Sequence, residues 1–267
     1  MAMGYTVEMT EDVLNILLFA IVGVIALLIY LLYISTISKV LETIGLTASE
    51  ASTVILLTLF FGWISIPLFP YRGWWVGISI GGALIPVILC SRLLKSGRAG
   101  LAESAIGIVI VAYVTYFVTR AEEGVGIVAD IPLAFAPALA AGLYSMSTFW
   151  TDMTKAAPLA YVSGVLGTLI GADVFRLNEV LSFNPPDDGI GMLSVGGANI
   201  FDMVYLTGIV AVVIAILVYR AKKRQEMYGF GAVVSEFERG SEGLPYAKDI
   251  RPSPLTRFGG DSRKRRE

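Results

Sequence analysis

Long apolar stretches with few charges recur along the chain, and they limit what it can fold into. The first stretch, residues 13–33, is about as long as the roughly 20 residues that a helix needs to cross a bilayer. The other stretches cover residues 51–69, 74–94, 101–119, 129–149, 156–175 and 201–220. Backbone polar groups inside a bilayer must be satisfied within the protein, which favours helices. The sequence therefore predicts an all-α polytopic membrane helix bundle with about seven transmembrane helices.

Composition agrees with this prediction and removes several kinds of chemistry. Charged residues make up 16% of the chain, against roughly 25% in soluble domains, and the mean hydropathy is +0.72. The chain has no histidine and a single cysteine, Cys90. Histidine-ligated metals, a histidine proton relay and an internal disulfide are therefore excluded. We expect neither a cofactor nor a metal site.

The distribution of charge predicts two parts and an orientation. Residues 1–221 form the predicted transmembrane domain, and residues 222–267 form a basic, largely disordered tail with eleven lysines and arginines. Basic loops face the cytoplasm, which places the N-terminus outside the cell membrane and the C-terminus inside. We expect the bilayer itself as a partner and anionic lipid at the basic tail. A further partner would be an unknown solute, ion or membrane protein, and nucleic acid is not expected.

Two short segments resemble each other. Residues 78–85 read ISIGGALI, and residues 193–200 read LSVGGANI. Each opens a predicted span that enters from the same side of the membrane. A duplication would give a 3+1+3 parallel repeat, an arrangement that some transporters use. Chance similarity in a chain rich in glycine and alanine is the alternative.

Two aspartates at the ends of predicted spans are the strongest candidates for function. Asp173 ends the span 156–175, and Asp202 begins the span 201–220. Ionisable groups at membrane segments are costly and mark functional sites by default. Asn199 lies three residues before Asp202, and Thr168 and Tyr205 add hydroxyl groups. We expect these five residues to bind a substrate or an ion.

Three interpretations of the aspartates are open. The aspartates serve a transport or ion-coupling protein, or they form the catalytic dyad of an aspartyl protease. They have a structural role if Asp202 caps its helix and Asp173 pairs with Arg176. The chain is then a non-catalytic membrane subunit or scaffold. Whether it is an enzyme is therefore open at this point.

Three strings around these residues resemble a known family. They are GTLIGAD at 167–173, the segment 194–208 with its SVGGANIFD and LTG, and IGGALIP at 80–86. They resemble the archaeal and bacterial membrane family called domain of unknown function 1614 (DUF1614). That family usually carries glycine after the second aspartate, where this chain has Met203. The resemblance implies a membrane scaffold and directs attention to the two aspartates, and it implies no reaction.

A looser likeness is to the presenilin-type intramembrane aspartyl proteases. Gly171-Ala172-Asp173, Phe201-Asp202 and Pro137-Ala138-Leu139 are similar to the three motifs of that family. The order of the motifs differs, because the glycine-type aspartate comes first here. This likeness implies a catalytic role for Asp173 and Asp202 as the alternative activity.

Overall fold

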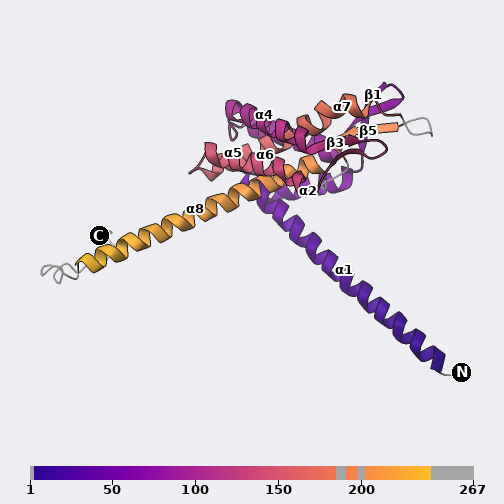
Figure 1. Cartoon of the computed structure of the whole chain (residues 1–267), viewed down its shortest axis with the longest axis horizontal. Helices are drawn as coiled ribbons and strands as arrows, with labels where there is room; N and C mark the ends of the chain where they lie inside the picture. Colours follow the sequence, from indigo (N-terminus) through magenta and orange to yellow (C-terminus); the bar gives the residue numbers. More distant parts are fainter. Residues whose placement is uncertain (1–2, 185–190, 198–201, 242–267) are drawn as a thin grey trace, which may run out of the picture. The chain divides into compact units, whose positions relative to one another are not determined.

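The computed structural model describes residues 3–184, 191–197 and 202–241 (Figure 1). The chain divides into two units, Met1–Tyr219 and Arg220–Glu267, which are treated separately. The second unit contains the C-terminal part of a helix that ends at Ser241. This helix extends into the predicted tail, and the rest of the tail lies outside the described residues. Its disorder stays a prediction.

Helices make up most of the first unit, which confirms the predicted all-α membrane class. Their bounds are α1 Met3–Thr43, α2 Ala48–Phe61, α3 Ile85–Lys95, α4 Leu101–Val118, α5 Ala136–Thr148, α6 Met153–Thr168, α7 Phe175–Val180 and α8 Met203–Ser241. Two π-helical segments, η1 Ile80–Leu84 and η3 Leu169–Val174, join directly to α3 and to α6. A short 3₁₀ turn, η2 Leu133–Phe135, precedes α5.

Four helical stretches of the described chain are long and apolar enough to cross a membrane. They are Val13–Thr43, Leu101–Val118, Met153–Val180 and Met203–Glu226. Each overlaps a stretch that the sequence predicted as a span. Two shorter apolar helical stretches, Ala48–Phe61 and Leu133–Thr148, overlap two further predicted spans. The number of spans and the internal repeat stay predictions.

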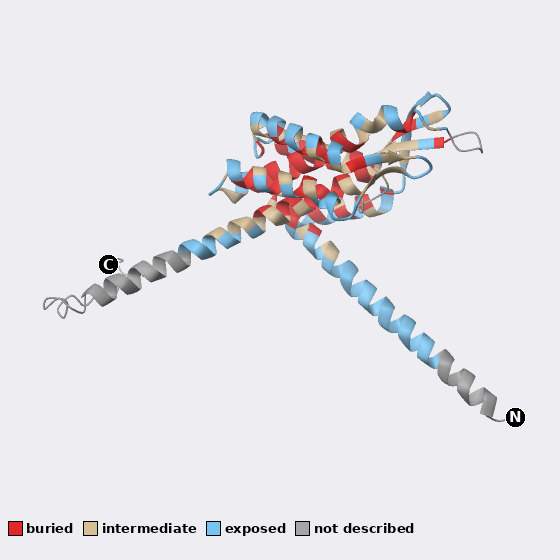
Figure 2. Cartoon of the chain, viewed as in Figure 1, coloured by how far each residue is buried: buried red, intermediate tan, exposed pale blue. Residues whose placement is uncertain are grey.

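The N-terminal part of α1 shows why this chain needs a membrane. Its large apolar side chains are exposed along most of its length, including Phe19 at 76% and Leu32 at 68% (Figure 2). Soluble proteins rarely expose an apolar surface of this extent. Hydrocarbon is the solvent in which such a surface is stable. The chain is therefore a membrane protein.

Helix α6 forms the centre of the first unit. It contacts α1, α3, α4 and α5, and most of its residues are buried. Small residues allow neighbouring helices to come close, as is common in membranes. A Cβ atom on Gly167 would lie 2.5 Å from the Cβ of Val111, and one on Gly171 would lie 2.3 Å from the carbonyl oxygen of Ala112. Glycine at these positions brings α4 into direct contact with α6 and η3.

Strands interrupt two of the predicted spans. The stretch 51–69 contains the helix α2 and then enters strand β1 (Ser65–Tyr71), and the stretch 74–94 begins with strand β2 (Trp74–Ser79). Pro67 and Pro70 oppose a helix because each lacks an N–H donor. Both lie on β1, the edge strand of a sheet with the order β1-β2-β5, where proline is tolerated.

The described residues form a three-stranded sheet and a two-stranded sheet. Strand β1 is antiparallel to β2, and β2 is parallel to β5 (Gly191–Val195). A separate hairpin joins β3 (Thr119–Glu122) to β4 (Gly126–Ala129). None of these strands was expected from the sequence.

The last turns of α1 pack into the core of the first unit. Ile37, Val40, Leu41 and Ile44 are buried in the core, on one face at helical spacing. Helix α1 ends at Thr43. A turn then leads into α2.

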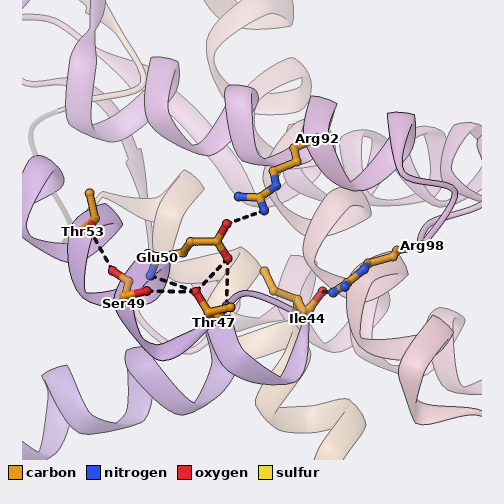
Figure 3. Close-up of polar contacts among 7 residues, drawn as sticks. All are labelled: Ile44, Thr47, Ser49, Glu50, Thr53, Arg92 and Arg98. Carbon is orange, nitrogen blue, oxygen red and sulfur yellow. Dashed lines mark hydrogen bonds and ion pairs between the residues drawn. The ribbon is translucent and has the colours of Figure 1, made fainter.

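Hydrogen bonds fix the junction between α1 and α2 (Figure 3). Thr47 is the N-cap of α2, and it forms a reciprocal capping box with Glu50. Arg92 of α3 forms an ion pair with Glu50. Arg98 donates to the carbonyl oxygen of Ile44 at 3.3 Å, beyond the end of α1. These contacts hold the ends of three helices together.

We expect replacement of Thr47 by alanine to destabilise the protein. The change removes the side-chain oxygen that accepts from the backbone of Glu50, and loss of such a cap costs about 1 kcal/mol. Thermal unfolding of the purified protein measures the loss. Thr53→Ala in the same helix is the control, because its hydroxyl only bonds back to the carbonyl oxygen of Ser49. Equal melting temperatures for the two variants would contradict the capping role.

The same junction predicts a dependence of stability on pH. Hydrogen bonds from the backbone of Thr47 and from Arg92 lower the pKa of the Glu50 carboxyl to about 2. A carboxyl with a lowered pKa stabilises the fold above its ordinary pKa, and the contribution is lost as the pH falls through the folded value. We expect the wild type to melt above Glu50→Gln at neutral pH. The difference should shrink between about pH 4 and about pH 2, and a constant difference would refute the linkage.

Candidate functional site: a buried aspartate pair

Asp173 is placed by the π-helical segment η3, which continues α6. The wider turns of a π-helix are uncommon, and they occur often at functional sites. Within η3, Gly171 lies against the backbone of α4, which fixes the depth of the next turn. One oxygen of the Asp173 carboxylate accepts a hydrogen bond from the backbone N–H of Gly196 at 2.9 Å. This bond ties η3 to the segment that follows β5.

The predicted pairing of Asp173 with Arg176 is not what the structure shows. The guanidinium of Arg176 forms an ion pair with Glu179 at 2.6 Å and donates to the carbonyl oxygen of Tyr116 at 2.7 Å. It also donates to the hydroxyl of Thr119. Among the described interactions, none joins Arg176 to Asp173. The carboxylate of Asp173 is thus held by a backbone N–H instead of a cation.

Asp202 stands at the start of α8, as the capping interpretation predicted. Its carboxylate accepts a hydrogen bond from the backbone N–H of Val204 at 3.1 Å. Its carbonyl oxygen accepts from the N–H of Leu206. Asp202 therefore caps the helix, which is one of the roles the sequence allows. A cap does not exclude a ligand, because one carboxylate has room for several hydrogen-bond donors.

Two consecutive glycines bring the aspartates together. Gly196 donates to Asp173, and a Cβ atom on Gly197 would lie 2.2 Å from an oxygen of Asp202. Both glycines have positive φ angles, 87° and 51°, a conformation that other residues rarely adopt. Adjacent Cα atoms are about 3.8 Å apart. The two carboxylates, from different helices, thus converge on neighbouring residues of one turn.

Both carboxylates line one cavity of about 390 Å³. Gly62, at the end of α2, together with Ser65 and strand β5 with its Ser194, also lines this cavity. The hydroxyls of Ser65 and Ser194 are hydrogen-bonded to each other at 2.6 Å. Among the described residues that line this cavity, none is lysine or arginine. The cavity therefore combines two acids with hydroxyl groups, and no described lysine or arginine in its wall balances the charge.

A second cavity of about 400 Å³ adjoins the first. The two cavities share Ile127, Asp202 and Met203 in their walls. Phe135 and Leu206 contribute to the rest of the second wall, which is mostly apolar. Asp202 and Met203 thus contribute to the walls of both cavities.

The other predicted site residues do not join the aspartates. Thr168 and Tyr205 are fully buried, and their hydroxyls have no hydrogen-bond partner among the described residues. Neither residue lines either cavity of the aspartates. Asn199 lies outside the described residues. A ligand-binding role for these three residues stays a prediction.

The two similar segments of the sequence lie side by side. Strand β2 pairs in parallel with β5, with Gly77 opposite Ser194 and Ile78 opposite Val195. After the strands, a Cβ atom on Gly82 would lie 1.8 Å from the carbonyl oxygen of Gly196. The double glycines therefore contact each other directly. The first segment continues into the π-helix η1 and the second into a turn, so their backbones differ after the strand.

Oxygen atoms dominate the chemistry of the site. Two carboxylates and two hydroxyls are ligands of the kind that hard cations and protons prefer. A buried carboxylate without a compensating charge is costly, and it takes up a proton or a cation. Among the described residues, no group of three or more histidine, cysteine, aspartate or glutamate side chains is placed to hold a metal ion. The geometry fits a proton, a small monovalent cation or the ammonium group of a larger molecule.

The residues that strands contribute to the site were not expected from the sequence. Ser65 belongs to a stretch that looked like a membrane helix, and its distance of 129 residues from Ser194 in sequence gives no sign of contact. Ile127 of β4 was likewise not singled out. The repeated serine and double glycine of segments 78–85 and 193–200 were the one available signal.

Comparison with known proteins gives one match. The model of the family described as "Protein of unknown function (DUF1614)" matches residues 32–214. This range covers both aspartates and all five strands. No curated protein and no solved structure matches the chain.

Proposed function

Because the chain belongs to the DUF1614 family, whose description assigns no activity, we propose a function from the site: Asp173 and Asp202 bind a proton or a monovalent cation in a membrane transport protein. One observation carries the proposal. Both carboxylates line a single cavity that no described lysine or arginine enters. Ionisable groups in such positions mark ion pathways and proton relays in membrane proteins.

The supporting elements resemble those of transport sites in general. Broken helices place backbone groups and acids beside coupling ions in many transporters. Here the helix departs from α-geometry at η3, between α6 and α7, and the turn at Gly196 and Gly197 lies against Asp202 at the start of α8. Backbone that leaves the regular helix is tolerated in a membrane where it is buried or lines a cavity. A cation site at the aspartates would explain why the backbone departs from a regular helix here.

The proposal includes a place in the cell. We assign the protein to the cell membrane, with its N-terminus outside and its C-terminus in the cytoplasm, because of the distribution of lysine and arginine. The basic tail, residues 222–267, would then meet anionic lipid on the inner leaflet. Both assignments follow from charge in the sequence.

Infrared titration of the purified protein tests the cation site. Protonated carboxyl groups absorb separately from carboxylates, and the titration is run with and without sodium ions. We expect carboxyl bands that disappear when the cation binds and that are missing in Asp173→Asn. Carboxyl bands in the wild type that neither the cation nor this substitution changes would refute the proposal.

A second candidate function, an intramembrane aspartyl protease, has its own supporting observation. Strand β5 is an edge strand of the described sheet, and its residues 192–195 line the cavity of the aspartates. Extended peptides bind to such edges by strand addition. Ala138 of the Pro137-Ala138-Leu139 motif lines the second cavity together with Asp202.

Proteolysis and transport predict different results in proteoliposomes. A protease cleaves co-reconstituted single-span proteins and loses this activity in either Asp→Asn variant. A transport protein shows carboxyl titration linked to the cation and leaves such proteins intact. A scaffold shows neither, and its aspartate variants differ from wild type in stability alone.

A further inference from the structure

The two cavities at Asp202 adjoin each other and share part of their walls. They share Ile127, Asp202 and Met203, and they have similar volumes of about 390 and 400 Å³. The first holds both carboxylates and the two serine hydroxyls. Apolar residues make up most of both walls, so a ligand that places a polar group at the carboxylates has apolar surroundings for the rest of its length.

The second space is built by two helices and a hairpin. Leu206 and Val210 lie four residues apart on one face of α8. Phe135 and Ala138 come from η2 and α5, and Ile127 comes from β4. Apolar walls with a few polar groups at one end are typical of sites for small molecules.

The charge of the two aspartates determines which polar group the ligand must carry. Asp173 and Asp202 each accept from a backbone N–H, which is a neutral donor and leaves the charge uncompensated. No described lysine or arginine lines either cavity. An anion would be repelled by the carboxylates, and a neutral alcohol supplies no charge to pair with them, so they would have to take up protons instead. A cationic group satisfies the site.

We propose that the two adjoining cavities bind a lipophilic organic cation. Its ammonium group lies at Asp202 and Asp173, and its hydrocarbon part lies between α5 and α8. This inference rests on the proposed cation site and names its substrate class. An ammonium group and a proton compete for the same carboxylates, so binding of one releases the other. Such competition is the basis for exchange of the two across a membrane.

The test is calorimetric titration of the full chain in lipid nanodiscs, with empty nanodiscs subtracted. The probes are methylammonium, hexylammonium and hexan-1-ol. We expect hexylammonium to bind more tightly than methylammonium, by up to about fourfold for each methylene that is buried. Hexan-1-ol, which has no charge, should bind more weakly than hexylammonium. Equal affinities for the two ammonium ions, or for hexylammonium and hexan-1-ol, would overturn the inference.

Two matched variants locate the hydrocarbon part. Ala134 lines the second cavity and not the first, so Ala134→Leu should weaken hexylammonium by tenfold or more and leave methylammonium unchanged. Ala102→Leu places the same side chain at an exposed position of α4 and should change neither. An unchanged affinity for hexylammonium in Ala134→Leu contradicts the proposed position of the chain.

Failure of this inference differs from failure of the cation site. Ammonium binding that depends on the aspartates and is independent of chain length leaves the cation site in place and removes the lipophilic substrate. Ammonium binding that Asp202→Asn leaves intact removes both. Hexan-1-ol binding by Asp202→Asn serves as the check that this variant retains a folded apolar cavity.

Discussion

Replacing Asp202 by asparagine is expected to abolish binding of the cation and to leave the fold intact. Asparagine caps a helix about as well as aspartate, so the hydrogen bond to Val204 survives the change. The substitution removes the negative charge of the side chain. Loss of one partner of a buried charge pair costs about 3–5 kcal/mol, which corresponds to a loss of affinity of a hundredfold or more. Calorimetric cation titration and thermal unfolding measure the two effects.

Two further variants distinguish the capping role of Asp202 from the role of its charge. Asp202→Ala removes both, so it should lose cation binding and also about 1 kcal/mol of stability. Asp152 caps α6 through its bond to the N–H of Thr154 and lines neither cavity of the aspartates. Asp152→Asn is therefore the matched control and should bind the cation like wild type. Full cation binding by Asp202→Asn would leave Asp202 with a capping role alone.

Replacing Gly82 by alanine is expected to disrupt the aspartate site through its contact with Gly196. The added Cβ would lie 1.8 Å from the carbonyl oxygen of Gly196, which is backbone and cannot swing away as a side chain can. The turn must move, and with it the N–H that binds Asp173. Overpacking of this kind costs about 1–3 kcal/mol, and occasionally more. We expect a lower melting temperature together with weaker cation binding.

A glycine elsewhere in the chain provides the comparison. Gly23 lies in α1, and a Cβ atom there would meet nothing within 4 Å. Gly23→Ala is expected to be neutral or slightly stabilising, because alanine favours helix over glycine. Gly82→Ala with the melting temperature and cation affinity of Gly23→Ala would show that the contact with Gly196 is not tight.

The aspartates show how far the sequence could predict the site. Their cost in a membrane singled them out, and the structure brings both to one cavity. Their convergence was not predictable, because it depends on a turn at Gly196 and Gly197. Thr168 and Tyr205 were near in sequence to the aspartates, yet they are buried elsewhere among the helices. Proximity along a chain does not say which face of a helix a residue occupies.

The strands show where apolar composition misled. Residues 51–69 and 74–94 are as hydrophobic as a span, and hydropathy alone cannot distinguish a buried strand from a buried helix. Pro67 and Pro70 favour an edge strand locally. The pairing of β2 with β5 joins residues more than 100 positions apart, which no local pattern encodes.

The sequence by itself determined that this protein folds in a lipid bilayer and which reactive groups it contains. Apolar stretches of membrane length require helices in a bilayer, because the backbone must satisfy its own hydrogen bonds there. Having no histidine and one cysteine leaves carboxylates and hydroxyls as its reactive groups. Tertiary structure alone decided which of these groups meet. Glycines without side chains let η1 approach the turn after β5 and let η3 approach α4, and these long-range contacts bring Asp173 and Asp202 to a common cavity.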